Sequence, residues 1–507
     1  MVMKRKIGYL WGLVLLVGCE VAEKQPLNMV VFIVDDMGWQ DTSVPFWEKP
    51  TSFNQLYQTP NMERLAEGGK IFTQAYATSV CSPSRTSLMT GMNAARHRVT
   101  NWTLRRDNPP DAKDTILTLP DWNYNGLQPV DSIPNGLYAT TLPQILQANG
   151  YYTIHTGKAH WGAMNTPGSN PLNLGFDKNI AGHAAGGLGS HLGEKYFGNA
   201  EPGAHSLPWG VPGMEAYHGD SINLAEALTI EALKALDERP KDQPFYLYLS
   251  HYIVHIPLEP AHKYYEKYRA MGLEEPEARY ASMVEEMDAS LGRLLQYLED
   301  HQLSENTAIV FLSDNGGLSA SARGGVLHTH NAPLNSGKGS AYEGGIRVPF
   351  IVKWPGKVLP NTRETTPIIV EDLFPTLLEM AGVQEYETIQ VVDGWSLAGL
   401  FKDKEKLKKR DLFWHYPNRW GANGPGIGPS STIRSGDWKL IHRHDLGKLE
   451  LYNLRNDIGE SVDLSEENPD KVLELAEKLT AHLKATQADI PAVKATGKPV
   501  PFPIDLL

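Results

Sequence analysis

The chain has 507 residues, a formal net charge of −12 at pH 7 and only two cysteines. An acidic surplus of this size argues against a general nucleic-acid binder, because such proteins need a basic surface. The hydrophobic fraction of 41% and the 46 glycines predict a large, loop-rich folded protein rather than a disordered chain.

The start of the chain has the pattern of an export signal. Three cations at residues 4–6 precede an apolar stretch over residues 7–17. This stretch is shorter than the roughly 20 apolar residues that a membrane-spanning helix needs. It ends in Leu-Val-Gly-Cys, which resembles the box of bacterial lipoproteins and implies cleavage before Cys19 and lipidation of its sulfur. We expect residues 1–18 to be the signal peptide of an exported bacterial lipoprotein, periplasmic or at the cell surface and tethered to the membrane, with secretion as the alternative.

The first strand is predicted at residues 29–34. Met-Val-Val-Phe-Ile-Val is a continuous apolar run, as expected for a strand that is buried on both faces. The run ends directly in Asp35 and Asp36. Two charged side chains therefore stand where a buried strand leaves the core.

Cys81 opens the sequence Cys-Ser-Pro-Ser-Arg, which ends at Arg85. A lone cysteine in an exported chain is open to oxidation and to pairing with other molecules, and a chemical role would explain why it is present. Taken by itself, a buried structural cysteine beside a turn proline is the simpler explanation, because free cysteines are most often packing residues. The rest of the chain has to decide between the two.

Two later strands are predicted at residues 245–249 and 308–312, with a helix between them. The helix shows apolar residues at three- and four-residue spacing, namely Met283, Met287, Leu291, Leu294 and Leu298. Strands that are separated by helices indicate an α/β protein. We expect a large, mainly parallel or mixed central sheet flanked by helices.

Polar side chains follow all three strands. Asp35 and Asp36 follow the first strand, His251 the second, and Asp314 and Asn315 the third. In α/β sheets ligands bind beyond the carboxyl ends of the strands. A set of oxygen ligands without a second cysteine suits Ca²⁺ or Mg²⁺ better than zinc. Each acidic pair taken alone is equally typical of turns and helix caps.

The end of the chain is predicted to form a smaller α+β subdomain over residues 401–507, after a larger domain over residues 26–400. The charged run at residues 402–410 indicates a solvated connector or helix face. Short antiparallel strands are expected at residues 431–434, 438–441 and 450–454. An amphipathic helix follows over residues 471–485.

Four further motifs follow Cys81 in the chain. They are Thr-Gly-Lys-Ala-His at residues 156–160, His-Ile-Pro at 255–257, Gly-Lys-Gly-Ser at 337–340 and Glu-Gly-Gly-Ile-Arg-Val-Pro at 343–349. Together with the cysteine motif and its continuation to Gly91, they resemble the formylglycine-dependent sulfatases of the alkaline phosphatase superfamily. The resemblance covers nearly the whole mature chain, implies an alkaline-phosphatase-like fold with a small carboxyl-terminal subdomain, and points to a bacterial carbohydrate sulfatase.

This resemblance implies a cofactor and a modified residue. A formylglycine-generating maturation enzyme would oxidise Cys81 to formylglycine, whose hydrate attacks the sulfur of a sulfate ester. One Ca²⁺ ion would lie beside it, with Mg²⁺ as the less favoured metal. The expected metal ligands are Asp35, Asp36, Asp314, Asn315 and the modified residue at position 81.

The other family positions fall on cations and histidines. Arg85 would steady the hydrate, and Lys158 would contact the sulfate. We expect His160 to be the base that collapses the sulfated intermediate, and His255 with Lys338 to protonate or stabilise the leaving alcohol; the division of acid and base roles among these three is open. Taken singly, Lys158 could be a surface cation and either histidine a hydrogen-bonded structural residue.

The expected substrate is a sulfated glycan or oligosaccharide. Several aromatic and basic residues could line a sugar pocket, some of them in residues 102–138 and 182–191, where family members vary. They are Trp102, Trp122, His183, His191, His251, His415 and Arg419. Each of them alone could equally be a packing residue in a long loop.

Two other functions fit the same residues. One is a phosphodiester or phosphonate monoester hydrolase of the same superfamily, which the relative turnover of aryl sulfate and aryl phosphodiester would reveal. The other is a non-catalytic glycan-binding lipoprotein that keeps the fold. No part of the expected catalytic set is missing from the chain, which favours the sulfatase.

Overall fold

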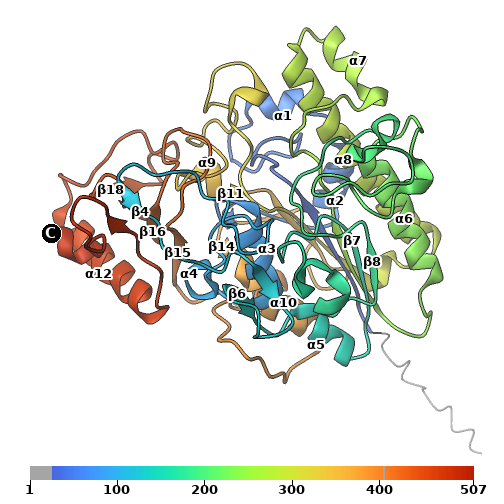
Figure 1. Cartoon of the computed structure of the whole chain (residues 1–507). Coiled ribbons are helices and arrows are strands. Elements are labelled where there is room, and N and C mark those ends of the chain that lie inside the picture. Colours follow the sequence, from blue (N-terminus) through green and yellow to red (C-terminus); the bar gives the residue numbers. More distant parts are fainter. Residues whose placement is uncertain (1–25, 404–405) are drawn as a thin grey trace, which may run out of the picture.

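The computed structural model describes residues 26–403 and 406–507 (Figure 1). The expected signal peptide at residues 1–18 and the expected lipidation site Cys19 lie outside the described residues, so both stay predictions. Within the described part of the chain, none of the helices has the length and hydropathy needed to cross a membrane.

An eight-stranded mixed sheet forms the centre of the protein. Its strand order is β13-β2-β12-β10-β1-β9-β7-β8. The five strands from β10 to β8 are parallel, whereas β12 runs antiparallel to both β10 and β2. The expected mainly parallel or mixed sheet is confirmed. The strands are β1 (Asn28–Val34), β2 (Lys70–Phe72), β7 (Tyr152–Gly157), β8 (Lys178–Ile180), β9 (Phe245–Ser250), β10 (Thr307–Ser313), β12 (Phe350–Lys353) and β13 (Thr362–Glu364).

Helices cover both faces of this sheet. Side chains of β1 alternate between two apolar cores, because successive residues of a strand point to opposite faces. The first core packs against α3 (Cys81–Thr90), α5 (Leu142–Ala148) and α10 (Leu373–Met380). The second packs against α2 (Pro60–Glu67), α6 (Leu224–Glu238) and α8 (Glu275–Asp300). The apolar run of β1 is therefore explained by burial on both sides.

The remaining elements are short. The helices are α1 (Ser52–Leu56), α4 (Ala94–His97), α7 (His262–Ala270), α9 (Glu343–Ile346) and α11 (Ala398–Phe401). A second sheet consists of β3 (Ala75–Tyr76), β11 (Arg347–Val348) and β14 (Ile368–Ile369). A two-stranded pair is formed by β5 (Gly126–Gln128) and β6 (Gly136–Tyr138).

Helix α3 has no apolar stripe of the usual kind, because all ten of its residues are buried and most are polar. Buried polar side chains are stable only with hydrogen-bond partners. Ser84, for example, accepts a hydrogen bond of 2.8 Å from the backbone N–H of Thr78. Gly91 ends the helix with φ of 70°, a left-handed conformation that favours glycine. The sequence of α3 thus combines polar residues that are held by hydrogen bonds with Leu88 and Met89, which pack in the first core.

A four-stranded antiparallel sheet follows in the carboxyl-terminal part, shown in orange to red in Figure 1. Helix α12 packs on one face of it and closes a separate apolar core. The expected antiparallel sheet and helix are confirmed. The elements are β15 (Asp411–Tyr416), β16 (Ser430–Ser435), β17 (Trp438–Arg443), β18 (Lys448–Asn453) and α12 (Pro469–Ala485).

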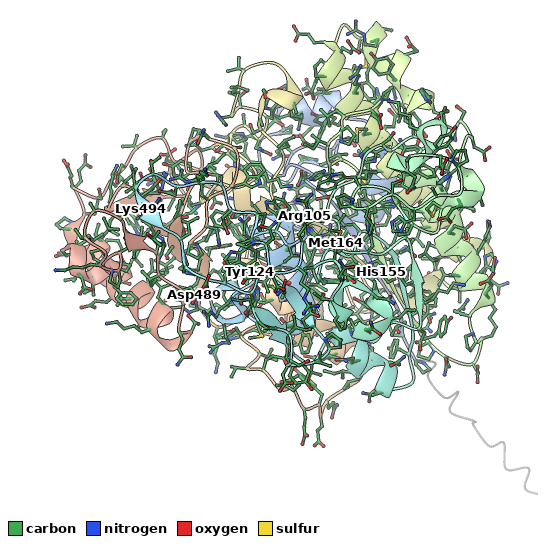
Figure 2. All side chains as sticks on the ribbon, in the orientation of Figure 1. Arg105, Tyr124, His155, Met164, Asp489 and Lys494 are labelled. Atoms are coloured by element: carbon green, nitrogen blue, oxygen red, sulfur yellow. The ribbon has the colours of Figure 1, made fainter. Side chains whose placement is uncertain are left out.

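The last segment of the chain returns to the larger part of the protein. Strand β19 (Ala492–Val493) pairs with β4 (Leu117–Thr118). Lys494, labelled in Figure 2 together with Asp489, donates a hydrogen bond of 2.6 Å to the backbone oxygen of Asp114. The boundary at residue 400 stays a prediction, and the two expected units are joined by such contacts.

Buried neutral histidines make the fold sensitive to acid. His155 of β7 stacks on Tyr248 and bonds the side-chain oxygen of Asn179, and burial lowers its pKa from 6.5 to about 4. Below pH 6.5 the ring of His155 binds a proton in the unfolded chain, whereas in the folded chain it stays neutral until the pH approaches 4. Stability is therefore lost as the pH falls from 6.5 towards 4.

We expect His155→Phe to flatten this dependence. Between pH 7.5 and pH 5 the parent should lose about 2 kcal/mol more than the variant, since one pH unit is worth about 1.36 kcal/mol per proton. Denaturant unfolding at both pH values measures the difference. His262→Gln, on the exposed face of α7, is the control and should keep the parent's slope. Equal slopes for the parent and His155→Phe would contradict this role.

Candidate active site

Four neighbouring parallel strands end at one edge of the central sheet. Their order is β10, β1, β9 and β7. Because parallel strands end at the same edge, residues far apart in the chain meet there. The first polar residues beyond these strands are Asp314 and Asn315 after β10, Asp35 and Asp36 after β1, His251 after β9, and Lys158 and His160 after β7.

Cys81 is the first residue of α3 and is buried, with 4% of its surface exposed. It is the only free cysteine in the part of the chain that the structure describes. Burial raises the pKa of its thiol, and the nearby charges of Lys158 and Lys338 act in the opposite direction. The chain around Cys81 also contacts the segments that carry both lysines: Gly339 donates a backbone hydrogen bond of 2.7 Å to Ser79, and Arg85 bonds the backbone oxygen of Lys158.

Three carboxylates gather beside these lysines. Asp35, Asp36 and Asp314 each offer an oxygen atom, and these atoms lie within 4.8 Å of one another. One oxygen each of Asp35, Asp36 and Asn315 is buried without a hydrogen-bond partner. A buried oxygen without a partner destabilises the folded state. A set of oxygen atoms of this kind is the coordination environment that hard divalent cations prefer. The residues present fit a calcium or magnesium ion.

Each carboxylate also has a cationic partner. Lys158 Nζ lies 2.5 Å from Asp35 Oδ2, and Lys338 Nζ lies 2.6 Å from Asp36 Oδ1. Arg85 pairs with Asp314 at 2.8 Å. Burial would raise the pKa of Asp36, but the positive charges of Lys338 and Lys158 hold it below its ordinary value.

The guanidinium of Arg85 has partners at the ends of several strands. Besides Asp314, it bonds the backbone oxygen of Lys158 at 3.0 Å and the hydroxyl of Ser250 at 2.6 Å. It thereby ties helix α3 to the ends of three strands. This arrangement makes Arg85 a positioning residue for the acidic cluster.

Two histidines complete the site, and their hydrogen bonds define their tautomers. His160 lies 2.8 Å from the backbone oxygen of Thr103 through Nε2, so Nε2 carries the proton and Nδ1 keeps a lone pair. His255 bonds the backbone oxygen of Ile256 through Nδ1 at 2.7 Å, so its Nε2 keeps a lone pair, 3.8 Å from Asp36 Oδ2. Burial lowers the pKa of His160 well below 6.5 and that of His255 to about 3. Both rings are neutral at pH 7.

The backbone of the site is held in an uncommon conformation. Asp36 has φ of 62° and His160 has φ of 58°, in the left-handed region that non-glycine residues rarely adopt. Strained residues of this kind cluster at functional sites. A Cβ added to Gly186 would lie 2.2 Å from Nδ1 of His160, so only glycine allows this loop to cover the ring.

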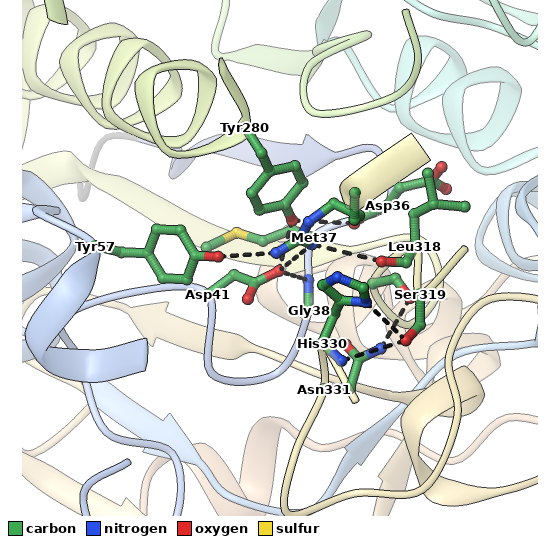
Figure 3. A network of polar contacts seen from close by, with 12 residues as sticks. Asp36, Met37, Gly38, Asp41, Tyr57, Tyr280, Leu318, Ser319, His330 and Asn331 are labelled. Carbon is green, nitrogen blue, oxygen red and sulfur yellow. Dashed lines mark hydrogen bonds and ion pairs between the residues drawn. The ribbon is translucent and has the colours of Figure 1, made fainter. Parts of the chain in front are cut away.

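A second polar network supports Asp36 from behind (Figure 3). Tyr280 of α8 donates a hydrogen bond of 2.5 Å to Asp41 and a longer one of 3.5 Å to the backbone oxygen of Asp36. The guanidinium of Arg323 lies 3.3 Å from the ring centre of Tyr280 and 3.4 Å from Asp41. Burial raises the pKa of Asp41, which Arg323 opposes. The turn that carries Asp36 is thus fixed from two sides.

Some of the expected sugar-binding residues lie near the site. The backbone oxygen of His183 accepts a hydrogen bond of 3.2 Å from the N–H of His160, and the ring nitrogen Nε2 of His183 has no partner in the described structure. Trp102 is partly exposed in the segment that carries Thr103. His191 bonds the backbone oxygen of His255 at 2.9 Å, so it positions that histidine rather than a sugar.

Others are placed inside the protein, which corrects the expectation that they face a sugar. His251 is fully buried and packs against Phe32. His415 uses both ring nitrogens within the carboxyl-terminal part, towards Ser431 and the backbone of Asp489. Trp122 is also buried and donates to Asp111, whereas Arg419 is partly exposed and pairs with Asp114 and Asp445, so its expected role stays a prediction.

Several residues that support the site could not be predicted from the sequence. Thr103 sets the tautomer of His160, and Ser250 holds Arg85. Trp420 lies 5.9 Å from Nζ of Lys338, measured to its ring centre, and packs against the backbone of Gly339. Thr103 and Trp420 stand in irregular segments where nothing in the local pattern marks them. Ser250 directly ends an apolar strand, and this position is a usable signal.

Comparison with known proteins identifies the family. The sulfatase profile matches residues 27–383, and a profile described as "N-sulphoglucosamine sulphohydrolase, C-terminal" matches residues 337–489. Among solved structures, Ps i-CgsB in complex with k-i-k-neocarrahexaose has 26% identity and a TM-score of 0.70, covering 90% of this chain and 93% of that one. The phosphonate monoester hydrolase of Agrobacterium radiobacter, with 20% identity and a TM-score of 0.60, shares the fold.

Curated relatives agree with this assignment. A protein named sulfatase from Formosa agariphila is 31% identical over 519 residues, which covers 92% of this chain and 89% of that protein. Human N-acetylgalactosamine-6-sulfatase is 29% identical over 477 residues, covering 87% of this chain and 82% of the human enzyme. With both parts of the chain matched and the catalytic motifs gathered at one sheet edge, this protein belongs to the sulfatase family and is a sulfuric ester hydrolase.

Proposed function

We propose that the protein hydrolyses sulfate esters on a sulfated carbohydrate with a formylglycine at position 81 and a calcium ion. The observation that carries this proposal is that hydrogen bonds and ion pairs join the helix that begins at Cys81 to the segments of two lysines and three carboxylates in one buried site. A structural cysteine needs none of these charges. A sulfate group, in contrast, needs fixed positive charge on its oxygens.

Asp35, Asp36, Asp314 and Asn315 would hold the metal. Their unpaired oxygens suit Ca²⁺, with Mg²⁺ as the less favoured ion because it demands a stricter octahedral geometry. The bound ion would supply positive charge that polarises the sulfate ester. Arg85 and the Tyr280 network would keep the carboxylates in place for it.

A formylglycine hydrate at position 81 would supply a hydroxyl nucleophile for sulfur. Lys158 and Lys338 are proposed to contact the sulfate oxygens, since the segments that carry them are hydrogen-bonded to Arg85 and Ser79, close to position 81 in the chain. The free lone pair on Nδ1 of neutral His160 makes this residue the proposed base. His255 and Lys338 are proposed to protonate or stabilise the departing alcohol.

The proposed substrate class rests on the relatives. Two of them refer to sulfated sugars in their names or titles. One is human N-acetylgalactosamine-6-sulfatase, and the other is the structure of BT4656 in complex with D-glucosamine-2-N,6-O-disulfate. BT4656 is 19% identical, so it supports the fold alone. The phosphonate monoester hydrolase stands at the same level of similarity and gives no specific support for the alternative reaction. We also propose that a maturation enzyme acts on Cys81 and that a lipid on Cys19 anchors the exported protein.

We expect protein made together with a formylglycine-generating enzyme to carry a modified residue 81. The peptide that contains it should be about 18 Da lighter than the cysteine form. Mass spectrometry measures this, and turnover of an aryl sulfate should rise with the modified fraction. Cys81→Ala should remove turnover, whereas Cys19→Ala should keep it. Faster turnover of an aryl phosphodiester than of the sulfate would instead favour the alternative hydrolase.

Removing calcium with a chelator should abolish turnover, and adding it back should restore turnover. Calcium at a hundred times its Kd should also stabilise the fold by about 2.7 kcal/mol. Asp314→Asn should lose both effects because it removes one negative ligand while keeping a polar partner for Arg85. Asp131→Asn, at an exposed loop position, is the matched control. Full calcium stabilisation in Asp314→Asn would place the ion elsewhere.

Tyr280→Phe should weaken calcium binding without changing the substrate contacts. Loss of a residue that orients a metal ligand costs roughly 10- to 100-fold in metal affinity or activity. We expect the calcium concentration for half-maximal turnover to rise within this range, while excess calcium restores kcat and KM stays unchanged. Tyr297→Phe removes a hydroxyl from the same helix, where it bonds Asp237, and should behave like the parent. An unchanged calcium requirement in Tyr280→Phe would refute its positioning role.

A further inference from the structure

Two adjoining cavities lie away from the catalytic residues. The first, of about 520 Å³, is lined by residues after β1, by β13 and by the β16–β17 turn. The second, of about 670 Å³, continues along the segment before β15. Both are lined by Arg434, Asp437 and Arg455, so they share a wall. We call the two together the basic groove.

Positive side chains dominate this groove in an otherwise acidic protein. Four arginines and two carboxylates line the first cavity, and six lysines or arginines and two carboxylates line the second. The chain as a whole has a formal net charge of −12. A local surplus of cations in a concave region focuses the electrostatic field and attracts anions.

Four of the cations have no carboxylate partner within 4 Å among residues 26–403 and 406–507. Arg434 is held by neutral groups only, namely the backbone oxygen of Gly436 and the side chains of Tyr76 and Gln74. Arg363 donates to the backbone oxygen of Pro45 at 2.6 Å. The other two are the exposed Lys408 and Lys409. The charges of the exposed Arg363, Lys408 and Lys409 are available to an external anion, whereas Arg434 is buried.

The remaining cations of the groove are already paired. Arg347 bonds Glu343, Arg410 pairs with Asp372, and Lys478 pairs with Asp411 and Glu474. Arg455 pairs with Asp437 at 2.7 Å, but its side chain is 75% exposed. An exposed ion pair of this kind is weak, so Arg455 can turn towards a ligand at little cost.

The first cavity also contains an aromatic surface. Trp47 is partly exposed there, and Nζ of Lys49 lies 5.3 Å from its ring centre. Sugar rings pack on aromatic faces, and sulfate groups pair with lysine and arginine. Each cavity alone has the size of a site for a drug-sized ligand, which is too large for a single inorganic anion. A concave, divided groove also suits a chain molecule better than a flat membrane.

We propose that the basic groove is a second, non-catalytic binding site for a sulfated polysaccharide. The occupant class rests on the proposed function. A polymer held there would keep its other sulfated units at a raised local concentration near the protein, as two linked sites do. Small sulfate esters cannot bridge the two sites and gain nothing from the groove.

The test is a binding measurement with Cys81→Ala protein on immobilised heparin at 0.15 M salt. The groove variant carries Arg363→Ser, Lys408→Ser, Lys409→Ser and Arg455→Ser. The control variant loses the same number of positive charges, but on the surface of other elements, through Arg64→Ser, Lys178→Ser, Lys234→Ser and Arg279→Ser. We expect at least about a tenfold loss of heparin affinity in the groove variant and less than a twofold loss in the control.

With cysteine restored at position 81, the groove variant should turn over an aryl sulfate at the parent's kcat/KM. Equal loss of heparin binding in both variants, or no loss in the groove variant, would overturn the proposal. Loss of binding to anionic lipid vesicles with unchanged heparin affinity would overturn it in favour of a membrane surface. Because heparin binding is measured without turnover, a parent that fails to cleave aryl sulfate refutes the proposed function and leaves the groove result intact.

Discussion

The site depends on keeping three carboxylates side by side and away from water. Asp35, Asp36 and Asp314 are fully buried and lie within reach of one ion. Like charges at this separation repel strongly in a medium of low dielectric constant, and each also loses its hydration. The arrangement is stable only because a cation is fixed beside each of them. These cations come from helix α3, from the end of β7 and from the loop before α9, so the complete sheet is needed to assemble one site.

The same constraint explains features that otherwise look unfavourable. Helix α3 buries polar residues because its first turns supply Cys81 and Arg85 to the site instead of apolar side chains to the core. Asp36 and His160 adopt left-handed backbone conformations directly after β1 and after β7. Such strain costs of the order of 1–3 kcal/mol per residue and persists only where the surroundings fix the chain. The two apolar cores on either side of β1 provide that rigidity, and Gly186 provides the space for the ring of His160.

The parts that could be predicted from the sequence are those in which local patterns determine position. Apolar runs fix where β1 and β10 end, and parallel strands end at one edge, so Asp35 and Asp314 could be brought together without coordinates. No such rule predicts the position of residues that face a sugar. His251 follows a strand as Asp35 does, yet it is buried and packs against Phe32. Both ring nitrogens of His415 make hydrogen bonds within the carboxyl-terminal part. Their surroundings are set by loops and by packing between distant segments, which leave no periodic signal.

Net charge alone is a poor guide to what this protein can bind. Within the site, Lys158, Lys338 and Arg85 are balanced by three carboxylates, so the uncharged-thiol form offers an anion little net attraction. On the proposed function, a divalent ion would tip this balance towards positive charge. Metal affinity and sulfate affinity would then be coupled, each raising the other by the same factor. In the basic groove, some of the cations have no carboxylate partner in the described structure, and no metal site is proposed there, so its affinity for anions would follow salt concentration but not calcium.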